Sequence, residues 1–175
     1  MKEWIRDIGV AVCAVLLTLQ FVRTARVSGV SMQPNFQPND LLFLSTQSYN
    51  NRDPKRGQVV IFRSALKDQN GKKELLIKRI IGVPGDTVII RNGRVRVNGK
   101  EQKSDYTKDL TTNGDITVLV PKDSYFVMGD NRLHSVDSRF SDVGFVRRES
   151  IRGRVVFRIL PLNRIGRTLD TGERR

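Results

Sequence analysis

One stretch, from residue 27 to residue 34, reads Val27-Ser28-Gly29-Val30-Ser31-Met32-Gln33-Pro34. Gly29 permits backbone angles that residues with a Cβ avoid, and Pro34 fixes its own φ and favours an extended Gln33. A serine held on such a bend presents its hydroxyl outward, so Ser31 is a candidate nucleophile. A lone serine in a turn is common, and the interpretation of Ser31 therefore depends on other parts of the chain.

Composition limits the class of protein. The chain has 175 residues, of which 38% are hydrophobic, and this suits one compact domain and excludes a disordered chain. A formal net charge of +13 predicts attraction to an anionic partner, either nucleic acid or a membrane surface. One cysteine and one histidine offer no intramolecular disulfide and no ligand set for a structural zinc ion. We expect neither a metal nor another cofactor.

An uncharged run over residues 8–22 precedes the serine stretch. A helix over residues 4–22 would rise about 28 Å, close to the hydrocarbon thickness of a bilayer. A cleaved secretory signal would need a small-x-small site after the run, but residues 21–26 are bulky and basic. A buried core helix would need a polar face, which the run lacks. The sequence therefore predicts an uncleaved transmembrane anchor over residues 4–22, preceded by residues 1–3.

Beyond the anchor, short apolar runs alternate with clusters of Gly, Pro, Asn and Asp, which is typical of a mostly β domain. Residues 64–74 are predicted to be an exposed connection with Asn70-Gly71 at its tip. The predicted strands include residues 41–44, 58–62, 75–81, 87–91, 94–97, 116–120 and 154–160. The predicted divisions are a main β domain over residues 23–87 and 123–163, a small inserted β lobe over residues 88–122, and a basic, fraying tail over residues 164–175.

The apolar strand at residues 75–81 carries two cations, Lys78 and Arg79. Strand alternation gives each of them apolar neighbours on its own face. Only the lysine can lose its proton, because arginine stays charged in proteins, whereas burial can make a lysine neutral near about pH 7 to 8. A strand-edge lysine whose ammonium reaches water is the alternative. Together, Ser31 and Lys78 indicate a nucleophile and its general base.

A third cluster, residues 129–139, follows an apolar strand and is dense in Gly, Asp, Asn, Ser and Arg. Such a loop can orient catalytic groups, and a solvated loop with surface ion pairs is the alternative. His134 suggests a second alternative, a Ser-His-Asp triad with Asp130 or Asp137. Ser31 lacks the G-x-S-x-G pattern, and a single histidine in a polar loop is commonly a surface residue, so we favour the lysine as the base.

Four parts of the sequence together resemble one family. They are residues 28–34, residues 78–86, residues 129–132 with 135–139, and the N-terminal apolar run. The chain is similar to bacterial type I signal peptidases, the membrane-bound serine proteases that remove signal peptides from exported preproteins. The short length, the single anchor and the small lobe resemble the compact Gram-positive members rather than the longer Gram-negative ones.

The resemblance implies a role for each motif residue. Ser31 matches the nucleophile and Lys78 the general base of the family's Ser-Lys dyad, which uses no cofactor. Ser135 matches the serine that hydrogen-bonds to the lysine and orients it. Asp137 and Arg139 match a structural ion pair that supports the site.

Other motif positions are less fully defined by the resemblance. Asp130 and Arg132 belong to the same supporting loop. Gly29 is a departure, because Gram-negative members carry a serine there whose hydroxyl helps to bind the oxyanion. The oxyanion hole would then rest on the backbone N–H of Ser31 and on a second donor that the sequence does not identify.

The resemblance also implies a fold, a substrate and a location. The fold is mostly β, and signal peptides are expected to bind as an added extended strand with an Ala-x-Ala-like preference. The anchor is flanked by equal numbers of cations, and the family places the N-terminus in the cytoplasm and the catalytic domain outside, near the export translocon. Met32 and Phe36 are then expected to rest against the bilayer, and the basic surface indicates anionic lipid rather than nucleic acid.

Two other classes of protein share some of these features. A membrane-tethered basic β domain that binds anionic lipid or nucleic acid without catalysis explains the anchor and the charge, but it leaves Ser31, Lys78 and Ser135 unexplained. Self-cleaving repressor proteases resemble signal peptidases in using Ser and Lys. They carry an N-terminal DNA-binding domain, where this chain has an apolar run.

Overall fold

The computed structural model describes residue 4 and residues 6–13, 22–102, 106–107 and 111–167. Residues 4 and 6–13 are helical. Across the described ranges, no helix has both the length and the apolar character needed to cross a membrane. Residues 14–21 of the predicted anchor lie outside the described residues, and Val22 belongs to a strand rather than to the predicted helix.

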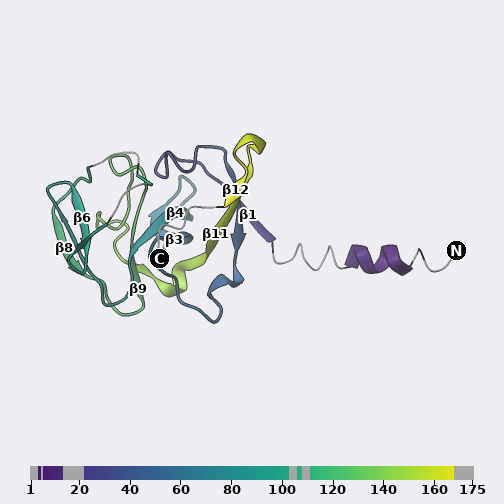
Figure 1. Cartoon of the computed structure of the whole chain (residues 1–175), viewed down its shortest axis with the longest axis horizontal. Coiled ribbons are helices and arrows are strands. Elements are labelled where there is room, and N and C mark those ends of the chain that lie inside the picture. Colours follow the sequence, from purple (N-terminus) through teal and green to yellow (C-terminus); the bar gives the residue numbers. More distant parts are fainter. Residues whose placement is uncertain (1–3, 5, 14–21, 103–105, 108–110, 168–175) are drawn as a thin grey trace.

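Twelve strands in the described part of the chain form two antiparallel sheets, so the predicted mostly β class is confirmed (Figure 1). The strands are β1 (Val22–Arg26), β2 (Leu41–Ser45), β3 (Val59–Lys67), β4 (Lys73–Gly82), β5 (Thr87–Arg91), β6 (Arg94–Val97), β7 (Lys100–Glu101), β8 (Ile116–Leu119), β9 (Ser124–Met128), β10 (Val146–Arg147), β11 (Ile151–Leu160) and β12 (Gly166–Arg167). The 3-10 helices are η1 (Gln47–Tyr49), η2 (Arg148–Ser150) and η3 (Leu162–Arg164).

The larger sheet has the strand order β1-β2-β11-β3-β4-β9-β10, with β12 also paired to β11. The smaller sheet has the order β7-β6-β5-β8 and comes from the segment between β4 and β9. Because β4 and β9 are neighbours in the larger sheet, this segment leaves and returns at adjacent strands. Figure 1 shows the smaller sheet at the end of the molecule opposite to the N-terminus.

Gly82, at the end of β4, lies where the two sheets meet. Val88 and Val120 from the smaller-sheet segment pack in one apolar cluster with Ile81 and Phe126 of the larger sheet. A Cβ at position 82 would lie 2.7 Å from Val88 Cγ2 and 2.9 Å from Val120 Cγ2. Only glycine therefore lets the sheets pack this closely.

Met32 and Phe36 are buried in the protein, so the prediction that they rest against the bilayer is wrong. Their side chains pack in one cluster with Val59 of β3 and Val155 of β11. Full burial of such a side chain contributes about 1.5–3 kcal/mol, so these two residues fix the turn that follows β1 onto the sheet. The sequence showed that this turn is apolar but not which way its side chains point.

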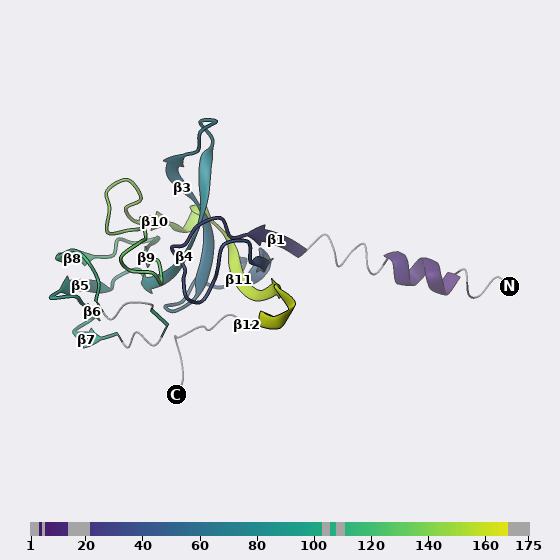
Figure 2. The same cartoon turned by 90° about the horizontal axis from the view of Figure 1, so that it is seen from above.

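The hairpin between β3 and β4 is longer than predicted, because residues expected in its connection form strand. Lys67 pairs with Lys73, which leaves residues 68–72 as the turn, with Asn70-Gly71 at the predicted tip. Backbone pairing thus continues beyond the apolar residues that marked the strands in the sequence. Figure 2 shows this hairpin projecting from the sheet.

Besides the two-residue β7 at the edge of the smaller sheet, two short edge strands were not predicted from the sequence. β1 pairs along its whole length with β2, and β12 pairs with Phe157 and Arg158 of β11 where we predicted a fraying tail. Both strands contain arginines and lack a clear apolar alternation, so the usual strand signal is absent. Residues 168–175 of the predicted tail lie outside the described residues.

Candidate active site

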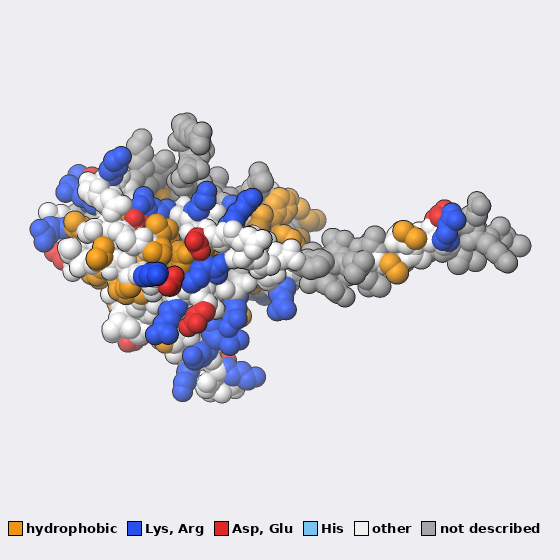
Figure 3. Space-filling view, turned by 90° about the horizontal axis from the view of Figure 1, so that it is seen from below, with side chains coloured by type: hydrophobic (Ala, Val, Ile, Leu, Met, Phe, Trp, Pro, Cys, Tyr) orange, Lys and Arg blue, Asp and Glu red, His pale blue; other side chains and the backbone are white. Residues whose placement is uncertain are grey.

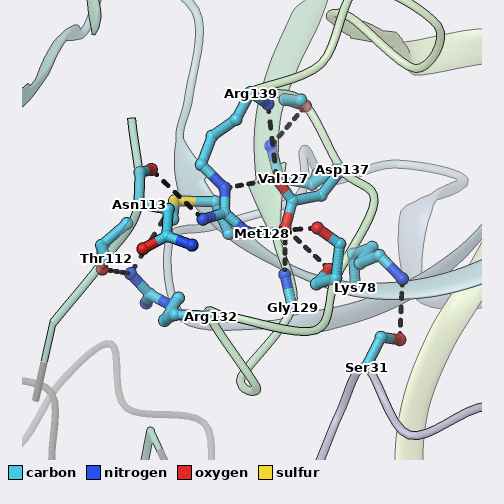
Figure 4. Close-up of polar contacts among 12 residues, drawn as sticks. Ser31, Lys78, Thr112, Asn113, Val127, Met128, Gly129, Arg132, Asp137 and Arg139 are labelled. Carbon is cyan, nitrogen blue, oxygen red and sulfur yellow. Dashed lines mark hydrogen bonds and ion pairs between the residues drawn. The ribbon is translucent and has the colours of Figure 1, made fainter. Parts of the chain in front are cut away.

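Ser31 and Lys78 lie together, although 47 positions separate them in the sequence. The turn after β1 carries the serine, and the middle of β4 carries the lysine. Figure 4 shows the two side chains pointing toward each other, and Lys78 Nζ donates a hydrogen bond to Ser31 Oγ over 2.8 Å. Lys78 is only 3% exposed. The distance is within the range over which a base can remove a hydroxyl proton.

Burial lowers the pKa of Lys78 from 10.5 to about 8. Asp137, Asp130 and Glu74 raise this pKa and so oppose the shift, whereas Arg139 lowers it further. Desolvation favours the neutral amine because the ammonium loses its hydration in the protein interior. A substantial fraction of Lys78 is therefore neutral in mildly alkaline solution and able to accept a proton.

The loop that follows β9 contacts the backbone of the serine turn. Asn131 donates from its N–H to Ser31 O over 3.0 Å and from Nδ2 to Val30 O over 3.2 Å. Gly129 permits this close approach, since a Cβ there would lie 2.4 Å from Ser31 O and 2.3 Å from Ser135 Oγ. Asn131 lies within the motif at residues 129–132, but the sequence predicted no role for it. In the structure Asn131 bonds to both peptide groups that flank the serine, one before it and one after it.

Ser135, Asp137 and Arg139 form one connected group beside the lysine. Asp137 accepts hydrogen bonds from Arg139 Nε over 2.8 Å and Nη2 over 2.9 Å, and both side chains are buried. Ser135 Oγ donates to Asp137 Oδ2 over 2.7 Å, and the Gly129 N–H donates to the same oxygen over 2.9 Å. Ser135 thus bonds to Asp137 in this structure rather than to the lysine, and its lone pairs remain able to accept.

Asp130 pairs with Arg79 of β4 and not with its near neighbour Arg132. Arg79 Nε donates to Oδ1 over 2.8 Å and Nη2 donates to Oδ2 over 2.7 Å, with the two side chains 1% and 0% exposed. Arg79 Nη1 donates to Gly57 O over 2.7 Å. Removing one partner of a buried pair leaves an uncompensated charge and typically costs about 3–5 kcal/mol.

The position of this ion pair links the two halves of the site. Arg79 directly follows Lys78, and Asp130 lies between Gly129 and Asn131. The pair therefore fixes the strand that carries the lysine against the loop that holds the serine turn. From the sequence, Arg79 was identified only as a fixed charge. The sequence could have predicted its ion pair, because an arginine in a strand buried on both faces needs a carboxylate partner.

Arg132 and His134 lie in the same loop but differ in environment. Arg132 is buried, and it donates to Thr112 Oγ1 over 3.2 Å and to the Tyr106 hydroxyl over 3.4 Å. His134 is exposed, and within the described residues its ring has no hydrogen bond to Ser31. Both carboxylates proposed as its partners are paired with arginines instead. The Ser-His-Asp alternative is therefore not supported.

Gly29, two residues before the serine, faces open space. A Cβ there would have no atom within 4 Å, and glycine has no side-chain donor to offer an oxyanion hole. Among the residues that the structure describes, the Ser31 N–H donates no backbone hydrogen bond. It is therefore available to bind a developing negative charge.

Comparison with known proteins matches the chain to a family. The family model described as signal peptidase, peptidase S26, matches residues 1–160. The chain belongs to this signal peptidase family. It is 40% identical to a signal peptidase I of Leptolyngbya laminosa, over 95% of this chain and 83% of that one. It is 36% identical to signal peptidase I P of Bacillus subtilis subsp. natto, over 93% of this chain and 91% of that one.

A solved structure supports the same assignment. The crystal structure of a signal peptidase I from Enterococcus faecalis has 31% sequence identity and a TM-score of 0.50, and the match covers 59% of this chain and 97% of that one. Peptidase family S26 consists of serine peptidases, so this signal peptidase family member is an enzyme. The family assignment therefore favours the peptidase over the binding domain without catalysis.

Replacing Lys78 by methionine should stabilise the fold at pH 7. The lowering of the Lys78 pKa from 10.5 to about 8 disfavours the folded, charged state by about 3 kcal/mol. Between these two pKa values the unfolded chain binds more protons, so wild-type stability rises with pH and the advantage of Lys78→Met shrinks. We expect about 3 kcal/mol more stability for the variant at pH 7 and less than about 1 kcal/mol at pH 10, measured by urea unfolding.

The control for this measurement is Lys122→Met, which changes an exposed lysine. It should alter the free energy of unfolding by less than about 0.5 kcal/mol at either pH. A Lys78→Met protein no more stable than wild type at pH 7 would contradict the burial of a destabilised ammonium.

Proposed function

We propose that this enzyme removes signal peptides from preproteins, with Ser31 as nucleophile and Lys78 as general base. The observation that carries the proposal is the 2.8 Å hydrogen bond between Lys78 Nζ and Ser31 Oγ, made by a lysine whose pKa burial lowers to about 8. Membership of the signal peptidase family supports the choice of substrate.

The first half of the reaction forms an ester. Neutral Lys78 takes the hydroxyl proton while Ser31 Oγ bonds to the carbonyl carbon of the scissile peptide. The carbonyl oxygen becomes an oxyanion, for which the Ser31 N–H is the candidate donor. Collapse of this intermediate breaks the C–N bond, and the Lys78 ammonium gives its proton to the leaving amine of the mature protein.

The second half releases the signal peptide. With Lys78 neutral again, it takes a proton from a water molecule that attacks the ester carbonyl. When the second intermediate collapses, the proton returns to Ser31 Oγ, and the signal peptide leaves with a new carboxyl terminus that loses the second proton of the water molecule to solvent. Ser135, Asp137 and Arg139 act as positioning residues, because their hydrogen bonds fix the loop that packs against the lysine.

The finer substrate preference follows from the same resemblance. We propose that the signal peptide binds as an extended strand and that small side chains before the cut fit shallow pockets, which gives an Ala-x-Ala-like preference. The absence of a side chain at Gly29 leaves the space beside the nucleophile open. The second oxyanion donor is therefore expected from another part of the site or from a change on substrate binding.

We also propose that the enzyme is a single-pass membrane protein with its N-terminus in the cytoplasm and its β domain outside, near the export translocon. The uncharged run supplies the anchor, which ends by residue 21 because Val22 already pairs in β1. The net charge of +13 favours an anionic lipid surface over a neutral one.

An apolar turn at the end of β11 offers the bilayer contact that Met32 and Phe36 do not. Leu160, Leu162 and Ile165 are 39%, 73% and 49% exposed. Figures 1 and 2 both show this yellow segment close to β1, and Figure 3 shows hydrophobic side chains gathered on that side of the domain. We propose that this turn rests on the lipid surface, since large exposed apolar side chains mark interaction sites.

Cleavage of a preprotein with an Ala-x-Ala signal by the detergent-solubilised chain tests the dyad. Wild type should cut, with kcat/KM falling about tenfold per pH unit below about pH 8 as Lys78 becomes protonated. Lys78→Arg keeps the charge but cannot act as the base, so it should lose activity at every pH. Cleavage by Lys78→Arg, or a wild-type profile that is flat down to about pH 5, would contradict the assignment of the base.

Depth-dependent fluorescence quenching tests the apolar turn. A fluorophore on Leu162→Cys, in a Cys13→Ser background, should be quenched by spin-labelled lipids when the full chain is reconstituted in vesicles with anionic lipid. The matched control is Leu119→Cys, which replaces a leucine that is 65% exposed on β8 of the smaller sheet. Equal quenching at the two positions, or none at 162, would contradict the proposed contact.

A further inference from the structure

Three arginines of the site contact one segment of the inserted lobe. This segment, called the strap here, consists of residues 106–107 and 111–113 between β7 and β8. Arg132 donates to Thr112 Oγ1 over 3.2 Å, and Arg139 Nη1 donates to Asn113 O over 3.4 Å (Figure 4). Two residues of the strap thus contact the loop that follows β9, residues 129–139, which is called the catalytic loop here.

Tyr106 of the strap covers the buried ion pair. Its ring centroid lies 4.4 Å from the guanidinium carbon of Arg79 and 5.8 Å from that of Arg132. The tyrosine is 5% exposed although it comes from a polar stretch of sequence. A guanidinium on an aromatic face is attracted by the ring quadrupole, and the attraction is stronger where water is excluded.

Asn35 connects the strap to the serine turn. Its Nδ2 donates to Tyr106 O over 2.6 Å and to Asp130 Oδ2 over 2.8 Å. Asn35 lies four residues after Ser31, so the tyrosine backbone, the carboxylate and the serine turn meet at one amide. Tyr106 therefore contacts Arg79 and Asn35, two of the residues that join the lysine strand to the serine turn.

We propose that Tyr106 is a positioning residue for the dyad, which keeps water from the Arg79–Asp130 pair and so holds Lys78 and Ser31 at hydrogen-bonding distance. The inference rests on the proposed function, because it assigns Tyr106 a role in that same reaction. A misplacement of reacting groups by about 1 Å can cost on the order of a hundredfold in rate.

A positioning role makes a prediction that a merely structural role does not. The charged groups that face Lys78 are Asp137, Asp130 and Arg139 on the catalytic loop and Glu74 on its own strand. Without the Tyr106 ring, water would reach the site and weaken the burial that lowers the Lys78 pKa. Asp130, less neutralised by its arginine, would also raise that pKa. Both changes move the acid limb of the activity profile to higher pH.

The experiment compares full-length Tyr106→Leu with wild type in preprotein cleavage across pH. We expect kcat to fall about ten- to a hundredfold with KM changed by less than about twofold, and the acid limb to move above its wild-type position near pH 8. Tyr106→Phe keeps the ring over Arg79, so its kcat and its pH profile should be those of wild type. Asn35→Ala removes the two hydrogen bonds from Asn35 to Tyr106 O and Asp130, and it should shift the acid limb in the same direction. This variant replaces Tyr106→Leu in the test if Tyr106→Leu does not fold.

Tyr49→Leu is the matched control. Tyr49 is also buried, and its ring centroid lies 5.4 Å from the guanidinium carbon of Arg148. Its hydroxyl donates a hydrogen bond to Gln58, and it lies outside the site. It should lower stability without moving the acid limb. A wild-type profile in both Tyr106→Leu and Asn35→Ala, or an equal shift in Tyr49→Leu, would overturn the positioning role. Wild-type cleavage and its own pH profile test the proposed function separately.

Discussion

Arg79 and Asp130 are both removed almost completely from water, and two buried charges are stable only when each satisfies the other. Their pair is formed by the residue after Lys78 and by the residue between Gly129 and Asn131. One interaction thus sets the distance between the strand that carries the base and the loop that holds the nucleophile. The larger sheet supplies the rest of the framework, since its strands β4 and β9 are hydrogen-bonded neighbours.

The reactive state of Lys78 comes at the expense of stability. Burial that lowers the pKa of this lysine to about 8 also makes its protonated form unfavourable in the folded chain. The surrounding structure offsets this cost through the apolar clusters on either side of the sheet and through the paired carboxylates Asp130 and Asp137, whose negative charge limits the shift. Catalytic groups commonly have such perturbed pKa values because their chemistry requires them near the working pH.

The sequence was sufficient to bring Ser31 and Lys78 together as a hypothesis, because, of the two cations in the apolar strand, only the lysine can lose its proton. It was not sufficient for the partner of Asp130. Arg132 lies two residues away and is chemically as suitable as Arg79, and only the pairing of β4 with β9 decides between them. Tyr106 gave no signal, since its burial depends on residues from distant strands. The apolar pattern predicted most strands. It missed the two-residue β7, and it missed β1 and β12, in which arginines replace apolar residues.

The most direct test of this account is an NMR titration of Lys78 itself in the wild-type protein, with labelled lysine side chains and Lys78→Arg used to assign the signal. We expect the Lys78 amine to titrate near pH 8, well below the ordinary lysine value of 10.5. Titration at or above 10.5 would contradict it, because the lysine would then be fully charged at every pH at which the enzyme could act.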